Sequence, residues 1–92
     1  MDKVKVKFFA YFRELFGARE MEIELKGSLT LAEFLDSLAQ TPQQKKELFH
    51  NGHLNPQVVV MVNGSVVNPE AFSEIKLESG STIAIFPMMG GG

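Results

Sequence analysis

KVKVKFF, at residues 3–9, alternates between lysine and apolar side chains as far as Phe8. A period of two residues is typical of a strand that has one face in water and the other in a core. We therefore predict a strand here, with Val4, Val6 and Phe8 pointing into the core. Phe9 then points to the opposite face of the sheet, beyond the lysine row.

A second alternating segment, EMEIEL, occupies residues 20–25 and carries glutamates where the first segment carries lysines. Its apolar side chains are expected to face the same core: Met21, Ile23 and Leu25. Rows of opposite charge favour cross-strand ion pairs, so we predict that the two strands are antiparallel neighbours. Between them, residues 10–16 have room for one or two helical turns, closed by Gly17 in a left-handed cap.

The main predicted helix begins after Thr30. Thr30 and Glu33 have the spacing of a capping box, which satisfies the free amides of a helix start. Apolar residues then recur at helical spacing along one face: Leu31, Phe34, Leu35 and Leu38. Thr41-Pro42 ends this helix and starts a shorter one that runs to Leu48 and Phe49. Residues 50–56 are predicted to form a loop.

The second half of the chain is again rich in strand signals. Residues 58–62 read VVVMV, and Asn63-Gly64 after them is a strong signal for a hairpin turn. Residues 65–67 are predicted to return as a short strand, followed by an irregular segment over residues 68–77. The last predicted strand covers residues 82–86 and ends at Pro87.

These elements fit one arrangement. A helix must cover the apolar face of the sheet, which favours placing the first and last strands side by side and parallel at its centre. We therefore predict an α+β protein with the β-grasp, ubiquitin-like fold: a mixed five-stranded sheet with one main helix. The domain is expected over residues 1–87, with residues 88–92 as a flexible glycine-terminated tail.

Composition narrows the possible functions. The chain has 92 residues, which suits one domain, and 9 Lys and Arg against 11 Asp and Glu, so nothing indicates a nucleic-acid partner. It has no cysteine and hence no disulfide, thiolate metal site or cysteine nucleophile. No apolar run approaches the roughly 20 residues of a membrane span, and no signal peptide is evident. We expect a soluble, cytoplasmic protein that binds no membrane.

The alternation also predicts an apolar patch on the outer face of the sheet. Phe9 and Phe86 end strands that the fold makes parallel neighbours, so their side chains should lie close together. Val59 and Met61 are expected on the same face, with Val66 as a companion. A monomer rarely leaves such a patch exposed without a partner. The alternative is that residues 68–77, or the loop after the first strand, fold back over it.

The final glycines form a candidate reactive group. Gly90, Gly91 and Gly92 have no side chains and can enter a narrow channel of another protein in extended form. The carboxylate of Gly92 is unhindered but inert until one of its oxygens becomes a leaving group, which requires ATP on a partner enzyme. The chain has no phosphate-binding loop of its own. It is therefore expected to bind no cofactor and to act as substrate and carrier, not as a catalyst alone.

Several stretches resemble the MoaD/ThiS family of ubiquitin-like sulfur carriers, nearer the MoaD branch. They are VKFFAYFRELFG at residues 6–17, Val62-Asn63-Gly64, LESGSTIAIFP at residues 77–87, and the terminal Gly91-Gly92. The resemblance places Phe9, Val66 and Phe86 at the family's hydrophobic contact positions.

The resemblance implies a reaction cycle. A ubiquitin-activating-type adenylyltransferase attaches AMP from ATP to Gly92, and a sulfur donor converts the acyl adenylate to a thiocarboxylate. In the MoaD branch the tail then enters the large subunit of molybdopterin synthase and donates sulfur for molybdopterin, with the carrier as the small subunit.

Two alternatives remain open at this point. A ubiquitin-like modifier would use the same adenylate but end in an isopeptide bond between Gly92 and a target lysine. A plain interaction module would bind partners whether or not Gly91-Gly92 is present. His50 and His53 are not accompanied by a third His or Cys ligand, so no metal site is predicted.

Overall fold

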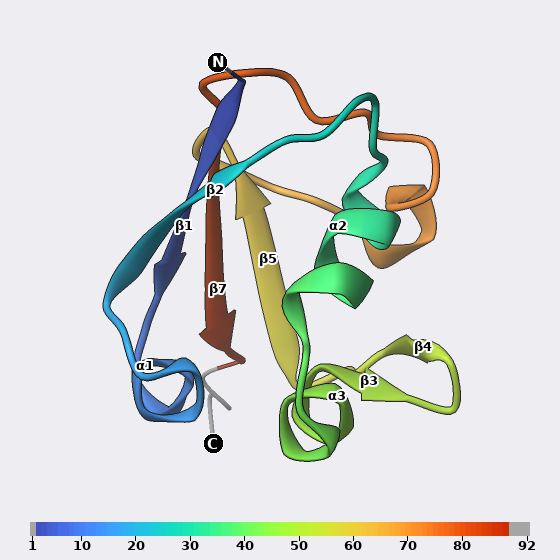
Figure 1. Cartoon of the computed structure of the whole chain (residues 1–92). Helices are drawn as coiled ribbons and strands as arrows, with labels where there is room; N and C mark the ends of the chain where they lie inside the picture. Colours follow the sequence, from blue (N-terminus) through green and yellow to red (C-terminus); the bar gives the residue numbers. More distant parts are fainter. Residues whose placement is uncertain (1, 89–92) are drawn as a thin grey trace.

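The computed structural model describes residues 2–88, and within this range five strands form one mixed sheet in the order β2-β1-β7-β5-β6 (Figure 1). The strands are β1 (Lys3–Phe8), β2 (Glu20–Glu24), β5 (Val58–Val62), β6 (Ser65–Val66) and β7 (Thr82–Pro87). The first and last strands, β1 and β7, are parallel neighbours at the centre, whereas every other pair is antiparallel. The predicted β-grasp fold is confirmed.

The lysine and glutamate rows lie opposite each other as predicted. Lys3 pairs with Glu24, and the register continues in steps of two residues to the other end of β2. Within residues 2–88 one ion pair forms, a diagonal contact of 3.6 Å between Lys5 Nζ and a carboxylate oxygen of Glu20. Both side chains are about half exposed, so the pair contributes little to stability, about 0.2–1 kcal/mol.

One residue of β2 differs from expectation. Leu25 is buried and Ile23 half-buried, but Met21 retains 37% of its surface exposed. Met21 lies opposite Val6, which is fully buried, so it occupies the predicted face of the sheet. Its exposure has a positional cause, because β2 is the outermost strand at this side of the sheet.

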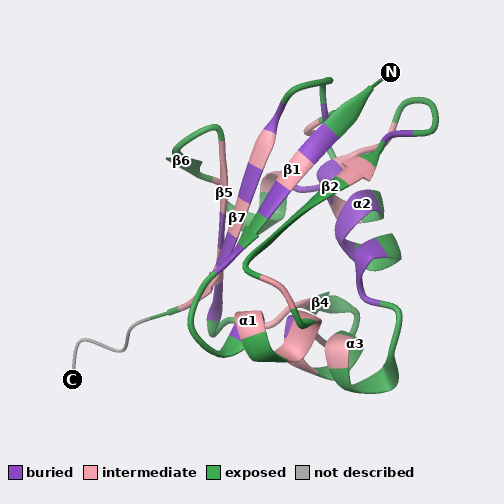
Figure 2. Cartoon of the chain, turned by 60° about the vertical axis from the view of Figure 1, so that its left-hand side comes forward, coloured by how far each residue is buried: buried purple, intermediate pink, exposed green. Residues whose placement is uncertain are grey.

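Helix α2 (Leu31–Leu38) covers the inner face of the sheet (Figure 1). The predicted capping box is present: Thr30 Oγ1 accepts the Glu33 amide at 3.1 Å, and the Thr30 amide donates to Glu33 Oε1 at 2.9 Å. All four residues of the predicted apolar stripe are buried. They meet the inward residues of β1 and β7, and buried and less buried residues alternate along both strands (Figure 2).

Two shorter helices lie at the end of the sheet where β1 and β7 end (Figure 1). Helix α1 (Tyr11–Phe16) ends at Gly17 in the predicted left-handed conformation, with φ of 72°. Helix α3 (Pro42–Leu48) begins with its own capping box, formed by Thr41 and Gln44. Among residues 2–88 no helix has the length and apolar character to cross a bilayer.

The prediction that residues 50–56 form a loop is wrong in part, because they include a short hairpin. β3 (Phe49–His50) and β4 (His53–Leu54) form a two-stranded hairpin, with Asn51 and Gly52 both at positive φ in the turn. The turn has the same Asn-Gly sequence as Asn63-Gly64, but no alternating segment flanks it to indicate a strand. The segment 68–77 contains a 3-10 helix (Pro69–Ala71) and packs at the start of α2, where the Ala32 amide donates to the Phe72 carbonyl.

Candidate functional site

Phe9 and Phe86 meet on the outer face of the sheet, as predicted. Their ring centroids are 6.0 Å apart and the ring planes are nearly perpendicular, at 88°. The Phe9 amide donates to the Ile85 carbonyl, so the ladder between β1 and β7 continues one residue past β1 and fixes the position of Phe9. Edge-to-face contact of this kind favours one mutual orientation of the two rings.

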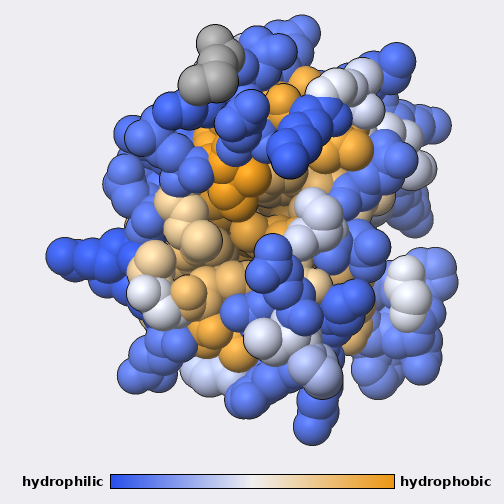
Figure 3. Space-filling model, viewed as in Figure 1, coloured by the Kyte–Doolittle hydropathy of each residue, from blue (hydrophilic) through white to orange (hydrophobic). Residues whose placement is uncertain are grey.

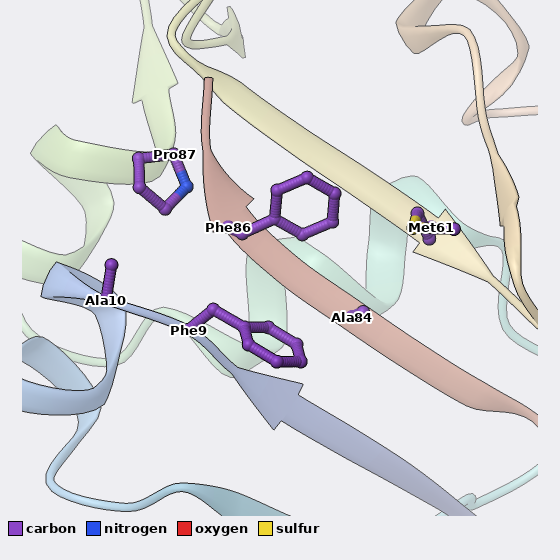
Figure 4. A pocket seen from close by; sticks show the side chains of 6 residues that line it. All are labelled: Phe9, Ala10, Met61, Ala84, Phe86 and Pro87. Carbon is purple, nitrogen blue, oxygen red and sulfur yellow. The ribbon is translucent and has the colours of Figure 1, made fainter. Parts of the chain in front are cut away.

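The two rings line an open hollow of about 370 Å³, which we call the outer-face hollow. Its remaining walls are also apolar (Figure 4): Ala10, Met61, Ala84 and Pro87. Because the described residues that line it include no titratable side chain, they offer no acid–base chemistry. Its chemistry suits the apolar side chains of another protein.

Of the other predicted patch residues, Met61 lines the hollow and two lie beside it. Val59 is opposite Phe86 in the β5–β7 register, and Val66 is opposite Met61 on β6. Val59 is half-buried, whereas Val66 is 67% exposed. The patch is therefore continuous from β1 across β7 and β5 to β6.

Neither of the proposed covering segments closes this patch. No residue of the 68–77 segment lines the hollow, and its Phe72 is buried in the core instead. The loop after β1 contributes Ala10 as a wall of the hollow, not as a cover.

Two supporting residues were not singled out from the sequence. Arg13 on α1 donates from Nε to the Phe8 carbonyl at 2.9 Å, and its guanidinium carbon lies 5.4 Å from the centre of the Phe9 ring. This cation–π contact adds a second partner to the Phe9 ring besides Phe86. Ala10 has φ of 53°, a strained value for alanine, where the chain turns from β1 into α1. In the sequence, Ala10 could have been found from the Phe-Phe-Ala stretch and Arg13 from the Arg-Glu-Leu stretch.

The last described residues lead away from the same end of the sheet. Pro87 lines the hollow, and the Met88 amide still donates to the Gln57 carbonyl beside it. The predicted reactive residues, Gly90, Gly91 and Gly92, lie outside the described residues. The hollow thus adjoins the point from which the chain continues to Gly92.

The remaining polar candidates lie elsewhere. His50 and His53 are paired across β3 and β4, and both are exposed. No group of three or more His, Asp or Glu side chains is gathered in a metal-binding arrangement over residues 2–88. The pKa of Glu33 is lowered by its hydrogen bonds from the Thr30 amide and hydroxyl, which is a helix-capping effect.

The fold and the exposed outer-face patch define a ubiquitin-like β-grasp protein. The chain belongs to the ThiS family, whose model matches residues 6–92. It is 29% identical over 91 residues to small archaeal modifier protein 3 of Haloferax volcanii, covering 98% of this chain and 99% of that protein.

Solved structures agree with this assignment. One is a putative molybdopterin converting factor, subunit 1, from Pyrococcus furiosus, with 30% identity, a TM-score of 0.74, and 95% and 98% of the two chains covered. Another belongs to the BexX/CysO complex of Amycolatopsis orientalis, with 26% identity, a TM-score of 0.71, and 97% and 99% covered.

Proposed function

We propose that this protein is a sulfur carrier that acts as the small subunit of molybdopterin synthase. The observation that carries the proposal is the apolar outer-face hollow at the point where Pro87 leads toward Gly92. Similarity to the Pyrococcus furiosus putative molybdopterin converting factor supports this branch of the family. Because activation consumes ATP, we place the cycle in the cytoplasm.

In this proposal the hollow serves recognition and the tail serves chemistry. A ubiquitin-activating-type adenylyltransferase binds the patch around Phe9 and Phe86. Residues 87–92 then reach up to about 20 Å into its active site, at about 3.3–3.6 Å per residue. The glycines let the tail pass through a narrow channel, since they carry no side chains.

The first chemical step activates the carboxylate. An oxygen of the Gly92 carboxylate attacks the α-phosphorus of ATP, which forms the acyl adenylate and releases pyrophosphate. Hydrosulfide released by the sulfur donor attacks the Gly92 carbonyl and displaces AMP, and the product is the thiocarboxylate. The large subunit of molybdopterin synthase binds the same patch. There the sulfur passes to the molybdopterin precursor, and an oxygen from water takes its place and restores the Gly92 carboxylate.

Intact mass spectrometry tests this directly. The protein is incubated with the adenylyltransferase, ATP and a sulfur source, and we expect a gain equal to one oxygen exchanged for sulfur. The gain should be absent when Gly92 is deleted. No gain with an adenylyltransferase shown to be active would contradict the proposal. An unchanged affinity for partners after deletion of Gly91-Gly92, with no sulfur gained, would favour a plain interaction module.

A second candidate is a protein modifier, favoured by the full-length similarity to small archaeal modifier protein 3. It shares the adenylate, but a target lysine attacks the Gly92 carbonyl and an isopeptide bond forms. Cell extracts would then contain high-molecular-weight species that resist denaturant and yield Gly92-linked lysine peptides. Their absence, together with the thiocarboxylate, would favour the carrier.

A further inference from the structure

Strand β2 leaves one row of main-chain groups without a partner strand. It forms one edge of the sheet, and within residues 2–88 it pairs only with β1. The Arg19 carbonyl accepts from Phe8 and the Leu25 amide donates to Asp2, so odd-numbered residues bond to β1. Because bonding alternates along an antiparallel ladder, the amides and carbonyls of Glu20, Glu22 and Glu24 point away from β1.

A depression with apolar and polar walls lies beside this edge, on the helix side of the sheet. It has a volume of about 590 Å³, and we call it the edge groove. Its apolar walls come from α1, β2 and α2: Phe16, Met21, Ile23, Phe34 and Leu38. Its polar walls are Lys26, Ser37, Gln40 and Gln44. Figure 3, viewed from the helix side, shows orange and tan surface in a hollow ringed by blue. Met21, which is 37% exposed, contributes to this surface.

The negative charge of the β2 edge favours one kind of partner strand. Glu20, Glu22 and Glu24 are all exposed, and the single ion pair found over residues 2–88 engages only Glu20. A second copy of β2 would place glutamates beside glutamates, and like charges on neighbouring strands destabilise the pairing. A strand with basic residues at the same positions would be favoured instead.

We propose that β2 and the edge groove bind an extended segment of a partner protein in which Lys or Arg alternates with apolar residues. The segment adds to the sheet through the free amides and carbonyls of the glutamates. Its basic side chains lie beside the glutamates on the outer face, and its apolar side chains contact Met21 and Ile23 over the groove. β1 has this pattern, KVKVKF, and already pairs with the other side of β2.

The full chain can be titrated with the capped peptide KVKVKF and observed through its amide resonances. We expect saturable shifts along β2 and new protection from hydrogen exchange at the amides of Glu20, Glu22 and Glu24. The capped peptide EVEVEF should bind about tenfold more weakly, since three cross-strand charge pairs are reversed. Equal binding of the two peptides, or shifts confined to Phe9 and Phe86, would overturn the proposal.

Charge reversal in the protein provides the matched test. Glu22→Lys should weaken KVKVKF binding about fivefold, because a favourable pair becomes a repulsive one. Glu74→Lys, at an exposed glutamate that does not line the groove, should leave it unchanged. Equal effects of the two variants would contradict the inference. Phe9→Ala should retain peptide binding, so this test stands apart from the sulfur-carrier proposal.

Discussion

Phe8 and Phe9 are adjacent residues with opposite roles. Phe8 is fully buried and stacks on Phe16 with ring centroids 4.5 Å apart, whereas Phe9 is 37% exposed beside the outer-face hollow. We expect Phe8→Ala to lower the free energy of unfolding by about 3–5 kcal/mol, because it leaves a core cavity. Phe9→Ala should cost less, about 1–2 kcal/mol, since more than a third of the Phe9 surface is already exposed.

Urea denaturation and binding to the adenylyltransferase separate these roles. Phe9→Ala should abolish binding while the variant stays folded, and Phe86→Ala should behave in the same way. Full affinity in either variant would show that the patch does not recognise this partner.

The two capping boxes provide a pH test, because one contains an acid and the other an amide. Thr30→Ala and Thr41→Ala should each cost about 1 kcal/mol at neutral pH. The pKa of Glu33 is lowered by its bonds to Thr30, so this stabilisation is complete above its ordinary value of 4.5 and is lost as pH falls below it. The cost of Thr30→Ala should therefore shrink in acid.

Thr41→Ala is the matched control, because Gln44 in its box does not titrate. Denaturant unfolding at a series of pH values would measure both differences. A Thr30→Ala cost that is constant through the acid range would show that the charge of Glu33 does not strengthen its cap.

At the scale of elements, the β5–β6 hairpin depends on its turn. Asn63 and Gly64 have φ of 51° and 85°, and Asn63 also exchanges hydrogen bonds with Thr82 at the start of β7. A Cβ on Gly64 would meet nothing within 4 Å. Gly64→Ala should thus cost roughly 1–2 kcal/mol through the left-handed conformation alone.

Gly64→Asn should cost clearly less, because asparagine tolerates positive φ better than alanine. Thermal unfolding of both variants would give the comparison. Equal losses would mean that contact with the turn, not its backbone conformation, sets the effect.

Local signals predicted most elements because each had a local physical cause. Alternation in residues 3–9, the box at Thr30 and the turn at Asn63-Gly64 act within a few residues, and all three appear in the structure. The β3–β4 hairpin was missed because strands of two residues are too short to show a period. Its Asn51-Gly52 turn was the only signal.

Some features of the site depend on the packing of the whole molecule and could not be predicted from neighbouring residues. The alternation of side chains between the two faces of a strand was enough to place Phe9 and Phe86 together, because it depends only on which strands are paired. The exposure of Met21 depends on where β2 ends the sheet, and the support of Phe9 by Arg13 depends on how α1 packs. These features arise only when distant segments come together.

The outer-face hollow and the edge groove lie on opposite faces of the sheet. Met21 of the groove is paired with the buried Val6, whereas Phe9 of the hollow faces outward. Effects at separated sites with no shared contacts add within a few tenths of a kcal/mol. We therefore expect saturation with the KVKVKF peptide to change affinity for the adenylyltransferase by less than about twofold. Calorimetry with and without the peptide would measure this, with Glu22→Lys as the variant in which only peptide binding is weakened. A tenfold or larger drop would mean that the two surfaces compete, and that the carrier cannot hold both partners at once.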